Sequence, residues 1–423
     1  MKILIAGGGI GGLTTALSLH AAGQTDLHVF EAAAEIRQLG VGVNLPPHAV
    51  RELTELGLGD ELARIGIPTS ELAYYDRRGK LIWAETRGLA AGYRWPQYSI
   101  HRGRLQQVLY EALTQRLGEG SVKTSRRLTG FEQGVVPHDG VRDEARNGLP
   151  DGVRARVSDR DGHSQVHQGD LLVAADGIRS AARAIVYPDQ GPLATNGWMM
   201  YRGTTQHAPF LSGTSMVIIG DEHLRVVVYP IGPDVINWLL VRPVPGEAGE
   251  LGNWNRELDP RQVATHVHDW TFDWLDVPAM IAGSQMAWEY PMADFDPLPR
   301  WVFGRVALLG DAAHAMYPFG SNGASQAILD ARVLAWSLAT HPGHIDEALA
   351  VYEAERRPVA SSVQLANRRQ AGDVMARISA LVRQDAHGAA KEELKAVEAQ
   401  YKKLAGFDAE TLNQRPSWSV VRT

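Results

Sequence analysis

The 423-residue sequence predicts an α/β fold, α+β overall, in which a Rossmann-like domain is interrupted by an antiparallel β-sheet and followed by C-terminal helices. Three observations support this fold. An apolar run at 3–6 leads into a glycine cluster and then a helical pattern. Two more apolar runs, at 171–175 and 306–309, end in Asp-Gly and Gly-Asp. Between them, from about 186 to 292, short strand-like runs alternate with Gly, Pro and Asp, as in a single antiparallel sheet.

The same patterns divide the chain into domains. The three glycine-ended strands belong to one discontinuous domain, at 1–70, 99–185 and 293–345. The inserted sheet domain takes 71–98 and 186–292, and the C-terminal helices take 346–423. A helical pattern covers 44–66, and an exposed hairpin or loop is expected at 134–168. An apolar stripe near the C-terminus is expected to pack on its own domain or to form a dimer face; it consists of Leu394, Val397, Tyr401 and Leu404.

Composition narrows the classes of function. The 42 Lys and Arg against 48 Asp and Glu give a net charge of −6, which argues against binding of nucleic acid. We expect no membrane span, because no apolar run reaches about 18 residues. The N-terminus lacks the basic start and cleavage motif of a signal peptide, so a cytoplasmic location is expected. The absence of cysteine excludes disulfides and Cys-ligated metals, and His266 and His268 lack a third ligand, so no metal site is expected.

The glycine cluster carries the first functional signal. Gly7 allows a tight turn out of the strand, Gly9 lets the backbone approach a pyrophosphate, and Gly12 allows the helix to pack closely, with Gly11 between them. The N-terminus of the helix then offers unpaired N–H groups to phosphates. Glu31, followed by Ala32, ends the next predicted strand at the position where a carboxylate accepts ribose hydroxyls. This arrangement predicts a dinucleotide site, with NAD and FAD both open.

Two further motifs distinguish between NAD and FAD. Asp176-Gly177 lies in DLLVAADGIRSAAR, and Gly310-Asp311 lies in GRVALLGDAAHAMYPFGSNGASQAILDA. In this order the motifs resemble those of the single-component flavin-dependent aromatic hydroxylases, typified by p-hydroxybenzoate and salicylate hydroxylases. Arg37 with Gly40 and Gly42, the segment HRGRLQQVL and the segment VYEAERRP extend the resemblance over roughly residues 1–370. The segments EIRQLGVGVN, PQYSIHRG and MYPFGSNGASQAILD look most similar to the phenazine hydroxylase of pyocyanin biosynthesis.

The resemblance implies FAD as the cofactor and assigns roles around it. Glu31 would hold the adenosine ribose, Asp311 a ribityl hydroxyl, and Pro318 would lie beside the reactive edge of the flavin. The loop after Pro318 would begin a helix aimed at the flavin N1–O2 edge, where a helix N-terminus stabilises negative charge. Asp176 would touch FAD and the nicotinamide cofactor, or else only cap the following helix. The remaining expected cofactor residues are Arg37, Gly42, Val43, Arg102, Gly177, Gly310, Gly320, Ser321, Asn322 and Gly323.

The implied reaction is insertion of one oxygen atom from O2 into an aromatic substrate through a flavin C4a-hydroperoxide, with NADH or NADPH as electron donor. The flavin carries this chemistry, so the scheme requires no acid–base pair and we predict no catalytic side chain. We see no second glycine fingerprint for the nicotinamide cofactor, as in this group. A flavin epoxidase or Baeyer–Villiger enzyme, and a non-redox flavoprotein, remain alternatives.

The predicted sheet suggests a substrate. Tyr201, Tyr229 and Trp238 offer flat aromatic contacts, and strand alternation means that some of them must face away from any cavity. Arg202 and Arg225 offer guanidinium groups to a carboxylate. We therefore expect an aromatic, anionic substrate of phenazine type, with phenol acids such as salicylate as the alternative, and a monomeric or homodimeric enzyme.

Overall fold

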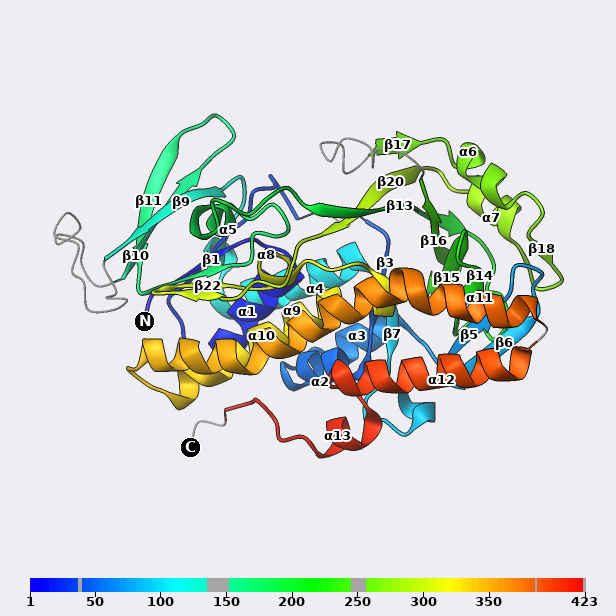
Figure 1. Ribbon diagram of the computed structural model, residues 1–423. Helices are drawn as coiled ribbons and strands as arrows, with labels where there is room; N and C mark the ends of the chain where they lie inside the picture. Colours follow the sequence, from blue (N-terminus) through cyan, green and yellow to red (C-terminus); the bar gives the residue numbers. More distant parts are fainter. Residues whose placement is uncertain (37–39, 135–151, 245–255, 385, 421–423) are drawn as a thin grey trace.

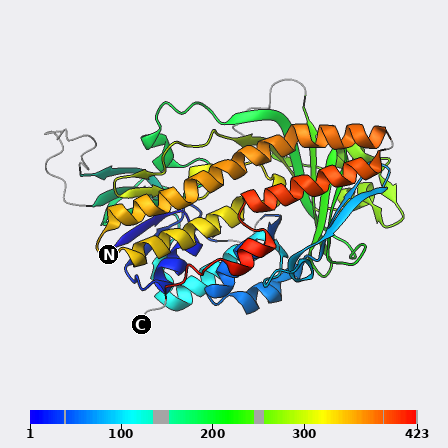
Figure 2. The same cartoon turned by 60° about the horizontal axis from the view of Figure 1, so that its bottom comes forward.

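The computed structural model describes residues 1–36, 40–134, 152–244, 256–384 and 386–420. Two β-sheet lobes lie side by side, and long C-terminal helices run along both of them (Figure 1; Figure 2). This arrangement confirms the predicted α/β class with an inserted sheet and C-terminal helices.

The first lobe contains a six-stranded sheet in the order β21-β22-β12-β1-β2-β8, parallel except for the edge strand β21. Its strands are β1 (Ile3–Ala6), β2 (Leu27–Phe30), β8 (Val122–Lys123), β12 (Leu171–Ala174), β21 (Val302–Phe303) and β22 (Val306–Leu308). The three predicted glycine-ended strands are therefore neighbours. Because the carboxyl ends of parallel strands meet at one edge, this order brings their three motifs together.

Helices and a small sheet bury both faces of the six-stranded sheet. The helices are α1 (Ile10–Ala21), α4 (Arg102–Leu117), α9 (Gly323–Thr340) and α10 (Ile345–Arg369), with the short α5 (Ala181–Val186) and α8 (Asp311–His314) beside them. A three-stranded sheet of β9 (Arg127–Gln133), β10 (Val153–Ser158) and β11 (Ser164–Gly169) packs against β1 and β12. The β10–β11 hairpin matches the later part of the loop expected at 134–168, and residues 135–151 lie outside the described chain.

The second lobe is built on an eight-stranded sheet in the order β17-β20-β13-β16-β15-β14-β5-β6. All neighbouring pairs are antiparallel except β14 and β5, so one pairing departs from the predicted antiparallel pattern. The strands are β5 (Glu71–Tyr75), β6 (Leu81–Thr86), β13 (Ala194–Gln206), β14 (Ser215–Gly220), β15 (Arg225–Gly232), β16 (Val235–Pro243), β17 (Arg256–Leu258) and β20 (Ala287–Asp294). One face is covered by α6 (Pro260–Ala264), α7 (Val277–Ala282) and the hairpin β18 (Thr271–Phe272) with β19 (Leu275–Asp276).

A short sheet joins the lobes. It pairs β3 (Gly42–Leu45), β7 (Tyr98–His101) and β4 (Gly66–Pro68), and β15 contacts both β7 and β4. The single helix expected over 44–66 is two helices, α2 (Pro47–Glu55) and α3 (Gly59–Ile65). Gly57 between them adopts φ +78°, a left-handed conformation that ends α2.

The C-terminal helices cross both lobes. Helix α10 continues through a π-helical turn, Gln370–Val374, into α11 (Met375–Arg383), and α12 (His387–Leu404) runs beside them before the short α13 (Ala409–Gln414) (Figure 2). Leu394 and Tyr401 of the predicted stripe are buried against the rest of the chain, so the stripe packs on its own molecule. Among the described helices, none combines the length and the apolar character needed to span a bilayer.

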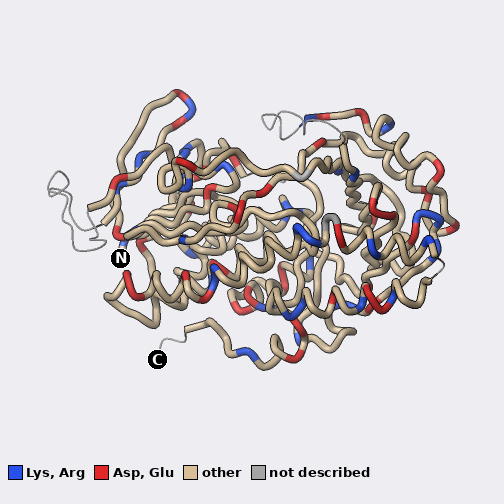
Figure 3. Tube along the Cα trace, in the orientation of Figure 1, with Lys and Arg blue, Asp and Glu red and all other residues tan. Residues whose placement is uncertain are grey.

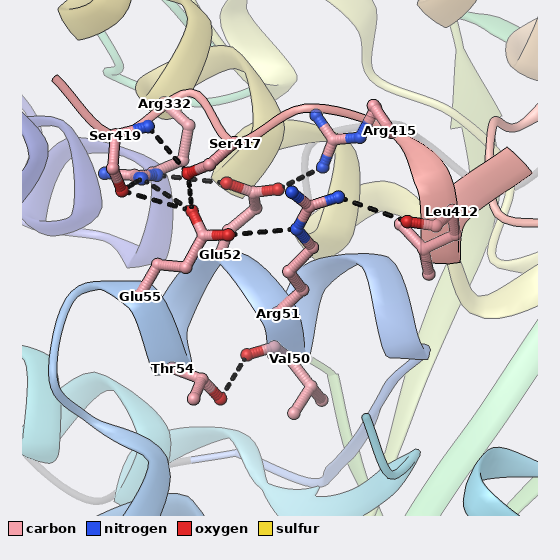
Figure 4. A network of polar contacts seen from close by, with 10 residues as sticks. All are labelled: Val50, Arg51, Glu52, Thr54, Glu55, Arg332, Leu412, Arg415, Ser417 and Ser419. Carbon is pink, nitrogen blue, oxygen red and sulfur yellow. Dashed lines mark hydrogen bonds and ion pairs between the residues drawn. The ribbon is translucent and has the colours of Figure 1, made fainter. Parts of the chain in front are cut away.

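A buried charge network fastens the chain's last segment to the first lobe (Figure 4). The Glu52 carboxylate on α2 is fully buried and pairs with Arg415 and, at 3.0 Å, with Nε of Arg332 on α9. Glu55, one turn later, accepts hydrogen bonds from Arg332 and from the hydroxyls of Ser417 and Ser419. Two carboxylates on one face of α2 therefore hold α9 and the C-terminal segment together.

Removing the charge of Glu52 should destabilise the fold. Glu52→Gln would remove the buried carboxylate that pairs with Arg415 and with Arg332, which is 3% exposed, and would leave Glu55 beside Arg332. Breaking such a buried pair costs about 3 kcal/mol. Urea unfolding should show this loss in free energy of unfolding. Glu61→Gln is the matched control, because Glu61 pairs with Arg64 on the surface and should cost less than about 1 kcal/mol. Equal effects of the two substitutions would contradict the structural role of the network.

Candidate functional site

A cavity of about 430 Å³ lies where the two lobes meet. One end is formed by the motifs that follow β1, β12 and β22, and the other by the sheet strands β13 to β16. It is lined by most of the predicted cofactor residues, namely Gly9, Gly11, Gly42, Val43, Arg102, Gly177, Gly310, Asp311, Pro318, Gly320, Ser321, Asn322 and Gly323. Segments more than 300 residues apart thus share one wall, as the order of the parallel strands requires.

The glycine loop has the geometry of a phosphate cradle. A Cβ on Gly12 would lie 1.9 Å from the carbonyl oxygen of Gly7, and Gly7 itself adopts φ +105°, so neither position accepts a side chain. Gly9 is different, since a Cβ there would meet no atom within 4 Å. It lines the cavity and begins α1 without a side-chain cap, which leaves the first N–H groups of the helix available to an anion.

Glu31 lies beside this loop at the end of β2. Its Oε2 accepts a hydrogen bond from the Gly8 amide and its Oε1 one from the Ala33 amide, each at 2.7 Å. Ala32, between them, is half-buried. Gln106 on α4 was not predicted, and its Nε2 donates to the Gly8 carbonyl at 2.8 Å. The backbone of Gly8 is thus held at its N–H by Glu31 and at its carbonyl by Gln106, two residues that come later in the chain.

In the second motif, Asp176-Gly177, the Asp176 side chain mainly stabilises the start of α5. Oδ2 of Asp176 accepts from the Ala181 amide at 2.8 Å, so the capping alternative is realised, while Oδ1 is buried with no partner among the described residues. Burial raises the pKa of this carboxyl. Arg183 joins the second and third motifs, because its guanidinium donates to the carbonyls of Ile178 and, at 3.3 Å, Ala312. Asp311, at the start of α8, is exposed toward the cavity.

The loop 317–323, which follows the third motif Gly310-Asp311, also lines the cavity. Gly320 and Ser321 adopt φ +75° and +53°, and α9 then begins at Gly323 with no side-chain cap. Asn322 is fully buried, and its Oδ1 accepts from Nε2 of His48 at 3.1 Å and from Gln326 at 3.2 Å. Burial lowers the pKa of His48 to about 3, so the imidazole is neutral at physiological pH. Two uncapped helix N-termini, those of α1 and α9, therefore open into the same cavity.

The C-terminal helices also support this loop. Asn367 on α10 donates to the Tyr317 carbonyl at 2.9 Å and accepts from the Tyr401 hydroxyl of α12 at 2.9 Å. A Cβ on Gly320 would lie 2.2 Å from the same hydroxyl oxygen, so α12 packs directly on the loop. In the sequence Tyr401 belongs only to an apolar stripe, and no motif marks it as a neighbour of the cavity.

The five expected substrate residues fall in three places. Arg202 and Tyr229 line the main cavity, with the Arg202 guanidinium 3.6 Å from the centre of the Tyr290 ring. Tyr201 and Trp238 lie in the core on the opposite face of the sheet, beneath α6 and α7, so they do not reach the cavity. There the Trp238 indole N–H donates to the Ser284 hydroxyl at 2.7 Å. Arg225 lines a second, smaller cavity next to the main one.

This second cavity, of about 100 Å³, shares the loop 319–321 and several sheet residues with the main cavity. The Arg225 guanidinium is sandwiched between the rings of Trp198 and Phe319, at 4.7 and 4.8 Å from their centres. Burial lowers the pKa of Arg225 to about 10, so the side chain remains a cation at neutral pH. A buried cation therefore lies next to an apolar cavity, close to the loop that carries Pro318.

The cavity fits FAD by three structural tests. The Gly9 position is open, two helix N-termini face the cavity without caps, and a carboxylate stands at the strand end where a ribose is bound. Arg102 begins α4 at the cavity wall, and Gly42 donates its amide to Oδ1 of Asn237 at 2.6 Å. Arg37 lies outside the described residues.

Potential metal ligands gather at one place in the described chain. Asp159, Asp161 and His163 lie at the exposed turn of the β10–β11 hairpin. Oδ1 of Asp159 accepts the amides of the other two, at 3.0 and 2.9 Å, as in an ordinary Asx turn. The grouping is explained by the turn and carries no argument for a metal.

Comparisons with known proteins agree with this site. Residues 1–366 match the family model described as FAD binding domain. Phenazine 1,6-dicarboxylic acid hydroxylase of Lysobacter antibioticus is 45% identical over 377 residues, which cover 86% of this chain and 89% of that protein. Salicylate hydroxylase of Pseudomonas putida is 31% identical over 395 residues, with 86% and 83% covered. HpxO of Klebsiella pneumoniae, solved with FAD and uric acid, has a TM-score of 0.76 at 26% identity, with 96% of each chain covered.

Replacing the Glu31 carboxylate should weaken FAD binding. In Glu31→Gln an amide N–H₂ faces one of two backbone N–H groups that now donate to the carboxylate, which disturbs the loop and removes an acceptor for ribose. Loss of a charge-assisted acceptor costs about 1.5–3 kcal/mol, or roughly tenfold to a hundredfold in affinity. Flavin fluorescence titration of apoprotein measures this change. The exposed Glu35→Gln serves as the control, and full FAD affinity in Glu31→Gln would show that the carboxylate has no such role.

A methyl group on Gly320 should perturb the loop more than positive φ alone explains. Gly320→Ala would incur about 1–2 kcal/mol of left-handed strain and also bring Cβ against the Tyr401 hydroxyl. Gly343→Ala is matched to it, since Gly343 adopts φ +82° but a Cβ there meets no atom within 4 Å. Thermal unfolding and FAD titration should both show the larger effect at Gly320. Equal losses would mean that α12 does not restrain the loop.

Proposed function

The chain belongs to the FAD binding domain family, and on that basis we propose that it is an aromatic hydroxylase that uses NADH or NADPH and O2 to insert one oxygen atom into an aromatic carboxylate of phenazine type. The observation that carries the proposal is the single cavity with two unlike ends. One end has the phosphate cradle, and the other is an apolar sheet with arginines at its border. Such a cavity would hold a flat substrate directly against a bound cofactor.

When bound, FAD supplies the redox chemistry that activates O2 for transfer of one oxygen atom. The protein's own residues bind, orient and exclude water. The glycine loop and α1 would hold the phosphates, and Glu31 would hold the ribose. The N-terminus of α9 has no side-chain cap, and its N–H groups would stabilise negative charge on a bound flavin.

The sheet end supports a flat apolar ligand. Its cavity-facing residues are mostly aliphatic or sulfur-containing, such as Met216, Val227 and Leu239, and Tyr229 adds an aromatic wall. These side chains exclude water from the reacting face, which strengthens electrostatic interactions there. Arg225 would receive a carboxylate from the adjoining cavity, and Arg202 stands nearer the cofactor end, beside Tyr229. Two separated arginines suit a substrate with more than one anionic or polar edge.

A phenol acid is the second candidate, favoured by the salicylate hydroxylase of Pseudomonas putida at 31% identity. Both substrate types combine a flat aromatic ring with a carboxylate. The experiment compares phenazine-1-carboxylate with salicylate as stimulators of NAD(P)H and O2 consumption, and measures product mass. A gain of one oxygen atom with the phenazine supports the proposal. Salicylate turnover without binding of the phenazine would overturn the substrate class and keep the hydroxylase.

The sequence also predicts no nucleic-acid partner, a cytoplasmic location and a monomeric or homodimeric state. Acidic and basic positions are interspersed along the described parts of both lobes in the view of Figure 3. A cytoplasmic location, where reduced nicotinamide cofactors are made available, and a monomeric or homodimeric state remain predictions.

NAD(P)H consumption without oxygenated product would favour neither hydroxylation nor an epoxidase or Baeyer–Villiger reaction. Product formation without NAD(P)H consumption would favour the non-redox alternative.

Arg225 should bind the substrate carboxylate. In Arg225→Met the buried charge is removed while the stem remains, so KM for phenazine-1-carboxylate should rise roughly tenfold or more, with a smaller change in kcat. KM for the corresponding carboxamide should change little in Arg225→Met, because the carboxamide is neutral. Arg261→Met, at an exposed Arg–Asp pair, is the control and should leave KM unchanged. Equal losses with acid and amide would show a structural role instead.

A further inference from the structure

Three cavities lie in a row from the cofactor end of the molecule to its surface. The main cavity shares Met216 and Phe319, among others, with the second cavity of about 100 Å³. The second cavity in turn shares four residues with a third, of about 150 Å³: Gln370, Val374, Val397 and Tyr401. Each cavity thus shares part of its wall with the next.

The third cavity reaches the surface between α10, α11 and α12. Its outer wall includes the exposed side chains of Arg369, Asp373, Arg377 and Gln400. Its inner wall is formed by the half-buried Val374 and Val397 and the buried Tyr401. The row therefore begins at solvent, passes between helices, and ends on the sheet side of the main cavity.

The backbone is irregular at the junction. One continuous helical segment runs from Ile345 to Arg383, and its π-helical turn, Gln370–Val374, lies where the second and third cavities meet. A π-turn inserts an extra residue into the helical ladder and is often found at functional sites. Here it places Gln370 at its start and Val374 at its end on the shared wall.

We propose that this row of cavities is the route by which the aromatic carboxylate reaches the main cavity, and that Val374, Val397 and Tyr401 form a constriction that selects it. The identity of the substrate rests on the proposed function. FAD held by the glycine loop and α9 would occupy the far end of the main cavity, which leaves the sheet end for the substrate. That end is the one continuous with the second cavity.

Size and charge along the route suit such a ligand. Ligand pockets usually measure about 300–1,000 Å³, so the second cavity, at about 100 Å³, is a neck rather than a complete binding site. Its walls are mostly apolar, as a flat ring requires, and valine side chains between two helices can part without breaking hydrogen bonds. At the mouth Arg369 and Arg377 outnumber Asp373. In the neck Arg87 pairs with Glu398 at 2.8 Å, and Arg225 adds a further cation that attracts an anion.

The chain contains no cysteine, so a single introduced thiol can block the neck selectively. Val397→Cys holoenzyme is compared before and after modification with N-cyclohexylmaleimide. Stopped-flow flavin fluorescence follows binding of phenazine-1-carboxylate and, in parallel, salicylate. We expect association and dissociation rates both to fall roughly tenfold or more while Kd changes less than about threefold, since a route alters both rates alike. Ala396→Cys, an exposed neighbour on α12, should show no effect of modification.

Three outcomes would overturn the route. Unchanged rates would place the entrance elsewhere. A rise in Kd carried by faster dissociation would make Val397 part of the final binding site. Equal slowing in modified Ala396→Cys would show a general effect of the label on α12.

Failure of the proposed function is distinguishable from failure of the route. If only salicylate binds, the phenazine assignment falls and the route is judged on salicylate rates. If neither ligand binds, the route is judged without a substrate: the thiol of Met216→Cys, which lines both inner cavities, should react with N-ethylmaleimide roughly tenfold more slowly when Val397 is replaced by Trp. Equal reactivity would overturn the route.

Discussion

The geometry of the site depends on one buried carboxylate, that of Asp330 on α9. Its Oδ2 accepts from the Gly310 amide at 3.1 Å and from Nε2 of His314 at 2.6 Å, and its Oδ1 accepts from Nε of Arg356 at 2.8 Å. Burial opposes ionisation, but the contacts with His314 and Arg356 hold the pKa of Asp330 below its usual value. The carboxylate thereby fixes the turn after β22, helix α8 and helix α10 relative to α9, and the cofactor end of the cavity takes its shape from them.

Buried polar contacts also connect the site to the C-terminal helices. Arg356 also donates to the side chain of Gln326 at 2.6 Å, and Gln326 contacts Asn322 in the cavity wall. From the other side, Asn367 and Tyr401 hold the backbone of the same loop. The match to the family model ends at residue 366, whereas the similarity to the structure of HpxO extends over 96% of this chain.

Local patterns predicted the parts of the fold that local chemistry determines. The strands before Gly7, Asp176 and Gly310 follow from apolar runs ended by residues that tolerate positive φ or lack a side chain, and all three are present. The substrate face was less predictable. Alternation shows that Tyr201 and Arg202 point to opposite sides of β13, but only packing of Trp238 over Gly203, beneath α6 and α7, decides which side is core. His48 and Tyr401 carry no motif, because tertiary contacts alone bring them to the loop.

The interleaving of the two lobes along the chain has a consequence for biosynthesis. In the six-stranded sheet β1 lies between β2 and β12, and β12 pairs in turn with β22, whose last residue is Leu308. A ribosome adding about 5–20 residues per second needs roughly 15–60 s to reach this point. Until then the N-terminal strand lacks a complete sheet, and the eight-stranded sheet is synthesised while the first lobe is unfinished. Nascent chains therefore expose apolar strand edges for most of translation, and the cofactor end of the cavity is complete only after β22 and the start of α9 have been synthesised.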